Sequence, residues 1–393
     1  MTDKFLFLAD FHVKARTWTN NTQVRGDAYV CMQQIGDFAE ENDLDTLVIG
    51  GDFFDSNRPT PDDLVQTVDF LSRFKQVYYI RGNHDSCDPS YLESVSRILG
   101  AKNFVTQLNG QFVHLGNDSY LTGISWMPSK EEYRLAVQQT LDYFRKNYPE
   151  RTLYLVLHTS FKHLLTFEGA YTFDTSEVAK WCKDMDVVLL VGDVHVRDTR
   201  RVAVFPPPAD TKGVLPNLGE LTFHSPGAVY PLQFNETDFA KAITIVNTAE
   251  DDYNRRLRPQ PVEVRKYASF HYTGTGDSLK DFLENFNNGY HVDYPDYLPA
   301  YIRVVLDTGV EPPHIIPSDY PNLVIQIQLE ADAFDPGHAI DSPDGSYTLE
   351  QAINDEFPDP DVAEIANQLV KSPDPAGDLQ KYLELWQVER TTM

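Results

Sequence analysis

Thiols and basic residues are scarce in this sequence. Its 393 residues include only three cysteines, Cys31, Cys87 and Cys182, with no C-x-x-C spacing. This set indicates neither a disulfide framework nor a thiolate zinc site, and it fits a reducing compartment. Lys and Arg number 33 against 59 Asp and Glu, a formal charge of −26. A protein that grips nucleic acid through a broad basic surface of its own is therefore disfavoured, and phosphate chemistry would need bound cations.

Long hydrophobic runs are missing as well. No apolar run approaches the roughly 18 residues of a membrane span, and the first apolar stretch is too short for a secretion signal. We therefore expect a cytoplasmic protein with no membrane association. Apolar residues make up 41% and charged residues 23% of the chain, which is ordinary globular usage.

Short apolar runs alternate with amphipathic stretches through the first half, which is typical of βα units. Thr60, followed by Pro61 and two aspartates, predicts the start of a helix between the second and third runs. The runs that we expect to be buried strands are Phe5–Ala9, Thr46–Gly50, Val77–Ile80, Leu153–Leu157 and Val187–Val191.

Turn residues predict that the sheet is mixed. Asn109-Gly110 lies between the apolar runs 104–108 and 111–115 and is a strong hairpin signal. The stretch 202–231 is rich in Pro and Gly and predicts loops and edge hairpins. Residues 240–246 then predict a closing strand.

The second half divides into further parts, with a domain boundary expected near residue 255. We expect a first domain at 1–255, a small α/β domain at 256–332, an acidic linker at 333–347 and a helical segment at 348–393. The small domain should contain strands at 262–272, 301–307 and 323–329 and a helix at 278–286.

Metal-binding side chains follow each of the five strands predicted in the first half. They are Asp10, His12, Asp52, Asn83, His158, Asp193 and His195. The carboxyl ends of strands in an open α/β sheet converge on one rim, where these side chains can meet. Carboxylates, imidazoles and an amide favour Mn²⁺, Fe²⁺ or Zn²⁺. Seven donors exceed the needs of one ion, so the pattern predicts a binuclear phosphoesterase site.

In order and spacing, these motifs resemble those of the calcineurin-like metallophosphoesterase superfamily. The motifs are D-x-H from Asp10, G-D-x-x-D from Gly51, G-N-H-D from Gly82, the lone His158 and G-x-x-H from Gly192. Residues 225–236 also resemble the segment that closes the nuclease domain in SbcD-type DNA-repair exonucleases and their phage recombination-endonuclease relatives. The resemblance implies a four-layer α/β/β/α sandwich with mixed sheets, followed by a small α/β capping domain and C-terminal helices.

The resemblance also implies roles for single residues. Asp10, His12, Asp52 and His195 would surround one metal ion, and Asp52, Asn83, His158 and Asp193 the other, with Asp52 as the bridge. His84 would donate a proton to the leaving oxygen, and Asp85 would orient the His84 ring.

Asp193 departs from the family pattern, which usually has histidine at this position. A carboxylate keeps a ligand and favours Mn²⁺ or Mg²⁺ over Zn²⁺. The competing interpretation is that Asp193 only braces His195 and that the second metal binds weakly.

Several neighbouring residues have weaker signals. Asp55 either supports the ligands or caps a loop, whereas Phe53 and Phe54 are expected in the core. The candidate DNA contacts are Trp126, which could stack on bases, and Arg197 and Arg200, which could meet phosphates.

The resemblance implies a Mn²⁺-dependent DNA exo/endonuclease subunit in a bacterial cell or a phage-infected host, acting in DNA repair or recombination. It would form a homodimer within a heterotetramer, whose SbcC-type coiled-coil ABC ATPase would supply the positive DNA surface. The C-terminal helices would either bind this ATPase or pack on the capping domain. Two alternatives remain open: a phosphatase or phosphodiesterase for small phosphoesters, and a catalytically weakened scaffold that binds DNA ends or an ATPase.

Overall fold

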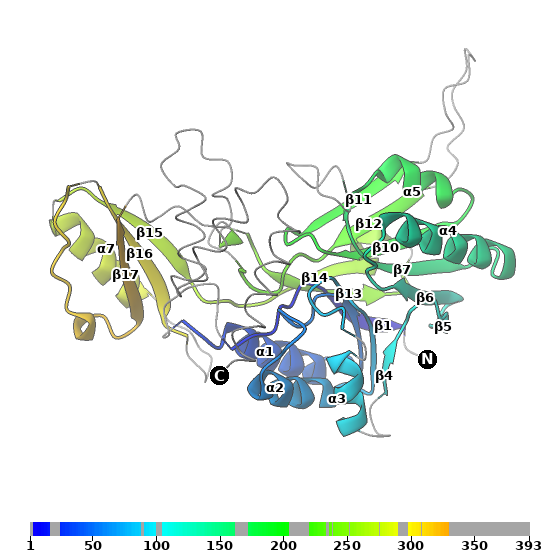
Figure 1. Cartoon of the computed structure of the whole chain (residues 1–393), viewed down its shortest axis with the longest axis horizontal. Helices are drawn as coiled ribbons and strands as arrows, with labels where there is room; N and C mark the ends of the chain where they lie inside the picture. The colour runs from blue at the N-terminus through cyan, green and yellow to red at the C-terminus, as the bar shows by residue number, and fades with distance from the viewer. Residues whose placement is uncertain are drawn as a thin grey trace, which may run out of the picture. The chain divides into compact units, whose positions relative to one another are not determined.

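A computed structural model shows a mixed α/β protein built on two six-stranded sheets with helices on their outer faces (Figure 1). The fold class is as expected. The structure describes residues 3–15, 24–87, 90–99, 104–161, 172–203, 220–232, 236–237, 239–250, 252–274, 276–289, 298–307 and 309–329.

The first sheet has a parallel centre and an antiparallel edge. β1 to β4 run parallel, β13 is antiparallel to β1, and β14 is antiparallel to β13. In spatial order its strands are β14 (Leu257–Pro261), β13 (Ala242–Asn247), β1 (Lys4–Leu8), β2 (Thr46–Gly50), β3 (Gln76–Ile80) and β4 (Phe104–Gln107). The helices α1 (Asp27–Glu41), α2 (Pro61–Ser72) and α3 (Tyr91–Leu99) pack on its outer face.

The second sheet repeats this plan. β6, β7, β10 and β12 run parallel, with β5 and β11 antiparallel at the two edges. In spatial order its strands are β11 (Asp198–Ala203), β12 (Glu220–Ser225), β10 (Asp186–Gly192), β7 (Thr152–His158), β6 (Ser119–Ile124) and β5 (Val113–His114). The helices α4 (Lys130–Asn147) and α5 (Thr175–Trp181) cover its outer face. A separate two-stranded sheet is formed by β8 (Ser160–Phe161) and β9 (Thr172–Phe173).

Between the two sheets lies a continuous apolar layer. Phe5 and Phe7 of β1 pack in it with Tyr154 and Val156 of β7. Alternate β1 residues, such as Leu6, face the helices instead. Because both faces of the central strands are buried, their sequences are continuous apolar runs, the pattern from which they were predicted.

Helix α2 begins where the sequence predicts it. The Thr60 side chain accepts a hydrogen bond from the Asp63 backbone N–H (3.2 Å), and the Asp63 carboxylate accepts one from the Thr60 N–H (2.7 Å). This reciprocal capping box, with Pro61 in the first turn, satisfies two otherwise unpaired donors.

The hairpin predicted around Asn109-Gly110 is wrong. The turn itself forms, since Asn109 and Gly110 have φ of 34° and 81° and Gln111 N–H donates to Leu108 O (2.6 Å). The strands on either side nevertheless join different sheets, because β4 pairs with β3 and β5 pairs with β6. The turn therefore carries the chain from one sheet to the other.

A three-stranded sheet follows the sandwich in the chain, in the order β15 (Tyr267–Tyr272), β16 (Ala300–Leu306) and β17 (Leu323–Leu329), with helix α7 at Gly276–Gly289. The first strand is shorter than the predicted 262–272. Residues before Tyr267 bond elsewhere: Val262 N–H donates to Lys241 O (3.0 Å), and the backbone of Glu263 exchanges two hydrogen bonds with the Gln34 amide.

By its contacts the chain divides into two compact units. The larger consists of Met1–Ala268, Glu284–Ile302 and Pro317–Val324, and the smaller takes the remaining segments. β14 pairs with β13, so the first sheet continues past the expected boundary at residue 255. The linker at 333–347 and the helical segment at 348–393 lie outside the described residues. Within the described residues, no helix is both long and apolar enough to cross a membrane.

The buried side chain of His224 connects the two sheets and should make the stability of the folded chain depend on pH. Its ring nitrogens lie 2.7 Å from the Thr199 hydroxyl and 2.6 Å from the Thr244 hydroxyl, and burial, with a smaller contribution from the charge of Arg197, lowers its pKa to about 3. At a pH between this value and about 6.5, the unfolded chain binds a proton at His224 that the folded chain excludes. His224 should therefore lower stability progressively as the pH falls through this range.

Urea unfolding of the wild type and of His224→Gln, both in the presence of a metal chelator, checks this pH dependence. The free energy of unfolding of the wild type, relative to the variant, should fall by about 2 kcal/mol between about pH 7 and about pH 4.5. A difference that stays constant over this range would show that folding leaves the pKa of His224 unchanged.

Candidate metal centre

Segments that follow five parallel strands form the candidate site. β1, β2 and β3 of the first sheet lead to Asp10, Asp52 and Asn83, and β7 and β10 of the second lead to His158 and Asp193. Hydrogen bonds link these segments at the rim formed by the carboxyl ends of the strands. Asp10 N–H donates to Gly51 O (3.2 Å), and Asp193 N–H donates to the Asp10 carboxylate (2.9 Å). The convergence predicted from the sequence is therefore present in the structure.

Left-handed backbone conformations turn the chain sharply at this rim. Asp10, His12, Asp52 and Asp193 have φ of 50°, 47°, 46° and 84°. Such angles are uncommon for residues other than glycine and cost free energy. Four of the seven predicted ligands thus have a strained backbone, which is typical of sites that position functional groups.

The predicted ligands form overlapping groups. Donor atoms lie within 4.8 Å of one another in the group of Asp10, His12 and His195 and in the group of Asp10, Asp52 and His158. His158 Nε2 is also 3.1 Å from Asn83 Oδ1, 3.2 Å from Asp52 Oδ2 and 3.9 Å from Asp193 Oδ1. The seven predicted ligands therefore lie together. Asp10 belongs to both groups, and Asp52 Oδ2 lies between His158 Nε2 and His12 Nε2, which is 3.6 Å away.

The donor set fits divalent cations. Among the described residues, His12 Nε2 is buried without a hydrogen-bond partner, and it lies 3.6 Å from Asp52 Oδ2, beyond hydrogen-bonding range. A buried nitrogen lone pair left unpaired is costly unless something else satisfies it. A cation between the imidazole and the carboxylate would do so, and this combination of donors suits Mn²⁺, Fe²⁺ or Zn²⁺.

Burial and mutual attraction shift the protonation of these groups. Burial alone would raise the pKa of Asp52, but His158, together with His12 and His84, outweighs burial and the pKa is lowered. Burial opposes the charged form of His158, yet the Asp52 carboxylate raises the pKa of His158 well above its usual value. At Asp10, burial dominates and raises the pKa. Positive charge is therefore strongly favoured at the centre of this carboxylate cluster.

Asp193 faces His158 rather than His195. One of its oxygens accepts a hydrogen bond from the Ser160 hydroxyl, and the other lies on the His158 side of the site. The competing interpretation, in which Asp193 only braces His195, has no contact to support it among the described residues. A different carboxylate holds His195.

The predicted role of Asp85 is wrong. Asp85 is buried, and its two oxygens accept hydrogen bonds from the backbone N–H groups of Gly82 (2.7 Å) and Phe53 (2.8 Å). The His84 ring instead bonds through Nδ1 to the Asp55 carbonyl (2.8 Å). Asp85 thus fixes the two loops that carry ligands, and the backbone of Asp55 orients His84.

Asp55 supports the ligands, one of the two interpretations left open by the sequence. Its carboxylate lies 3.4 Å from His12 Nδ1 and 2.8 Å from Lys14 Nζ. Burial acts against the charge, but the hydrogen bonds from His12 and Lys14 lower the pKa of Asp55 to about 2. Phe53 and Phe54 are fully buried, as expected.

Glu236 and Lys241 are functional candidates that the sequence analysis missed. Glu236 Oε1 lies 2.9 Å from His195 Nδ1, and Glu236 Oε2 lies 3.3 Å from Lys241 Nζ. Both residues are buried. The only available signal was their position: Glu236 ends the segment 225–236, and Lys241 follows shortly after it. Neither residue was assigned a role.

The predicted substrate contacts lie outside the ligand cluster. Trp126 is half-buried, and its backbone N–H donates to Arg81 O (2.8 Å), next to the loop that carries Asn83. Arg197 and Arg200 are exposed, and Arg200 pairs with Asp198 (2.6 Å).

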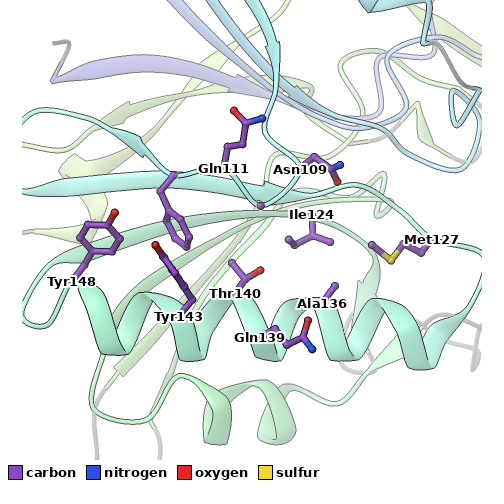
Figure 2. Close-up of a pocket in the computed structure, with 11 residues that line it drawn as sticks. Asn109, Gln111, Ile124, Met127, Ala136, Gln139, Thr140, Tyr143 and Tyr148 are labelled. Atoms are coloured by element: carbon purple, nitrogen blue, oxygen red, sulfur yellow. The ribbon is translucent and has the colours of Figure 1, made fainter.

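A separate cavity of about 520 Å³ lies between α4 and the 109–112 turn (Figure 2). Thr140 and Tyr143 of α4 line it on one side, and Ile124 and Met127 line it on the other. None of its lining residues is charged and none is histidine, so this cavity offers neither the carboxylates nor the imidazoles found at the rim.

Fold and site together define a metal-dependent phosphoesterase. Residues 3–197 match the family of calcineurin-like phosphoesterases. The chain therefore contains a calcineurin-like phosphoesterase domain, and the family resemblance found in the motifs is confirmed at this level.

The chain is also similar to proteins of DNA repair. The DNA double-strand break repair protein Mre11 of Saccharolobus solfataricus is 24% identical over 181 residues, which cover 45% of this chain and 46% of that protein. The protein of the same name from Methanosarcina acetivorans is 34% identical over 87 residues, covering 21% of this chain and 14% of that protein. The matched region thus spans less than half of either relative.

Among solved structures, a dimetal phosphatase from Danio rerio matches with a TM-score of 0.41 and 11% identity. The match covers 62% of this chain and 92% of that one.

Close backbone packing at Gly82 makes the site sensitive to one added methyl group. A Cβ at Gly82 would lie 2.0 Å from Asp52 Oδ1 and 2.5 Å from the Asp52 backbone nitrogen. Gly82→Ala should therefore displace the central carboxylate and weaken Mn²⁺ binding about 10- to 100-fold, as measured by equilibrium dialysis.

Gly36→Ala is the matched control, because its Cβ would meet only the end of the flexible Arg73 side chain. This variant should bind Mn²⁺ like the wild type. Unchanged binding by Gly82→Ala would show that Asp52 is not a ligand.

Proposed function

We propose that this chain is the nuclease subunit of an SbcD-type DNA-repair or recombination complex, a phage-type relative that hydrolyses DNA phosphodiesters with two Mn²⁺ ions. The single observation that carries the proposal is the convergence of seven oxygen and nitrogen donors at one rim. The similarity to two proteins named for DNA double-strand break repair favours DNA over other phosphoesters.

In this proposal Asp10, His12, Asp52 and His195 hold one ion, and Asn83, His158 and Asp193 hold the other together with Asp52. When bound, the ions polarise the phosphate and activate the attacking water. His84 supplies the remaining chemistry. Its Nδ1–H donates to the Asp55 carbonyl, so the ring presents Nε2 to the leaving oxygen, and in its imidazolium form, with a proton on both nitrogens, it can donate the Nε2 proton there.

The negative net charge of this chain supports the presence of a protein partner. A chain of formal charge −26 repels DNA, so a second protein would have to supply most of the positive surface. We propose an SbcC-type coiled-coil ABC ATPase for this role, bound by residues 348–393, with a homodimer of this chain inside a heterotetramer. Arg197, Arg200 and Trp126 are the proposed DNA contacts near the site.

We propose the three-stranded sheet with α7 as a capping domain that selects the shape of the DNA. The expected limits of this domain were 256–332. Because Leu257–Pro261 belongs to the first sheet, the pairing favours a start after residue 261.

Substrate choice is the direct test. The full chain, alone and with the ATPase partner, is incubated with end-labelled linear duplex, circular single-stranded DNA and a chromogenic phosphodiester, with Mn²⁺ or with chelator. We expect Mn²⁺-dependent cleavage of DNA that Asp52→Asn abolishes. Rapid turnover of the chromogenic ester beside intact DNA would instead identify an enzyme for small phosphoesters, and no turnover of any substrate would identify a scaffold.

Replacing His84 separates catalysis from metal binding. His84→Gln should lower kcat about 100-fold or more and leave two Mn²⁺ ions bound per chain, because a proton donor is lost and no ligand is. His84 also lies close enough to His12 and Asp52 to join a metal group. Loss of one Mn²⁺ from the variant, measured by dialysis, would contradict the assigned role and make His84 a ligand.

A further inference from the structure

A buried ion pair lies behind His195. Glu236 is 7% exposed and Lys241 is 5% exposed. Glu236 stands between the two basic side chains, with Oε1 2.9 Å from His195 Nδ1 and Oε2 3.3 Å from Lys241 Nζ. Burying two charges is costly, so a pair this deep needs either a packing reason or a functional one.

The two oxygens of Glu236 have different neighbours. Oε2 accepts hydrogen bonds from Lys241 Nζ and from the Leu232 backbone N–H (3.0 Å), so two donors face it. Oε1 faces His195. Lys241 itself lies directly before β13, where its carbonyl accepts a hydrogen bond from Val262 N–H (3.0 Å). The carboxylate is therefore fixed in one orientation.

This orientation selects the tautomer of the His195 ring. A carboxylate can only accept at Nδ1, so Nδ1 carries a proton and Nε2 keeps its lone pair. The His195 ring stands 5.3 Å from the His12 ring, and its ligand atom belongs to the group with Asp10 and His12. The free nitrogen of His195 is thus the one available to a cation at that group.

We propose that Glu236, oriented by Lys241, is a positioning residue that presents His195 Nε2 to a divalent cation held with Asp10 and His12. The inference rests on the proposed two-metal function and adds two residues to its machinery. Glu236 touches neither substrate nor metal and acts only through the imidazole. Carboxylates in this position fix both the orientation and the basicity of a ligating histidine.

Glu236→Gln gives a sharp test, because the surroundings decide how the amide points. Leu232 N–H and Lys241 both donate toward the Oε2 position, so the glutamine oxygen must occupy it. The amide NH₂ then faces His195 Nδ1 and donates to it. Nδ1 becomes the acceptor, the proton moves to Nε2, and the ligand lone pair is lost.

The double variant E236A/K241M provides the contrast. It removes both charges together, leaves no buried ion unpaired and frees the ring to adopt either tautomer. If Glu236 and Lys241 only stabilised the fold, E236A/K241M would have both weaker Mn²⁺ binding and a lower Tm than Glu236→Gln. A positioning role makes Glu236→Gln worse for metal binding, although it is nearly isosteric and should unfold at a higher temperature than the double variant.

The experiment measures Mn²⁺ binding by equilibrium dialysis, the electron paramagnetic resonance spectrum of bound Mn²⁺, and Tm in chelator, for the full-length wild type, both variants and the exposed control Glu131→Gln. We expect two Mn²⁺ ions per wild-type chain and a spin-coupled spectrum. Glu236→Gln should lower the affinity for one of the two Mn²⁺ ions about 10- to 100-fold and show the spectrum of an isolated ion. E236A/K241M should lose less affinity but more thermal stability, and Glu131→Gln should match the wild type.

Wild-type binding by Glu236→Gln would overturn this inference alone, as would losses of affinity that follow the losses of Tm. A wild-type chain that binds no Mn²⁺ would overturn the proposed function, and the inference with it.

Discussion

The meeting of parallel strands from two mixed sheets at one rim is the constraint on which the rest of the structure depends. β1 to β3 end there from one sheet, and β7 and β10 end there from the other. The sheets approach so closely that a Cβ at Gly192 would lie 2.4 Å from the Gly50 carbonyl. At this rim predicted ligands such as Asp10 and Asp52 have left-handed backbone conformations. The apolar layer between the sheets supplies the stabilisation that holds this strain in place.

Around the ligands lies a layer of polar groups that hold them. Asp85 ties two loops together, Asp55 supports His12 and His84, and Glu236 holds His195. Each of these carboxylates is satisfied by backbone N–H groups or by basic side chains, so each keeps its orientation without occupying a ligand position. The result is a rim with concentrated negative charge in a protein that is already acidic, and this charge favours bound cations before any phosphate arrives.

The sequence predicted most of the strands, and it predicted that the candidate ligands would meet at one rim, because both predictions depend on local patterns. Strands such as Thr46–Gly50 are continuous apolar runs, and each ligand comes directly after one. The sequence could not predict partners that depend on tertiary approach. The turn at Asn109-Gly110 has the local conformation of a hairpin, but which sheet each flanking strand joins is decided by long-range packing. Glu236 was missed for the same reason, since its distance from His195 in the chain says nothing of their contact in space.

The most direct test is crystallographic, with anomalous diffraction from Mn²⁺ in crystals of the full chain. The account predicts two anomalous peaks at the rim, separated by about 3.5 to 4 Å, with Asp52 between them and His195 Nε2 directed at one of them. Two peaks elsewhere, or an empty rim with His12 and Asp52 apart, would contradict it.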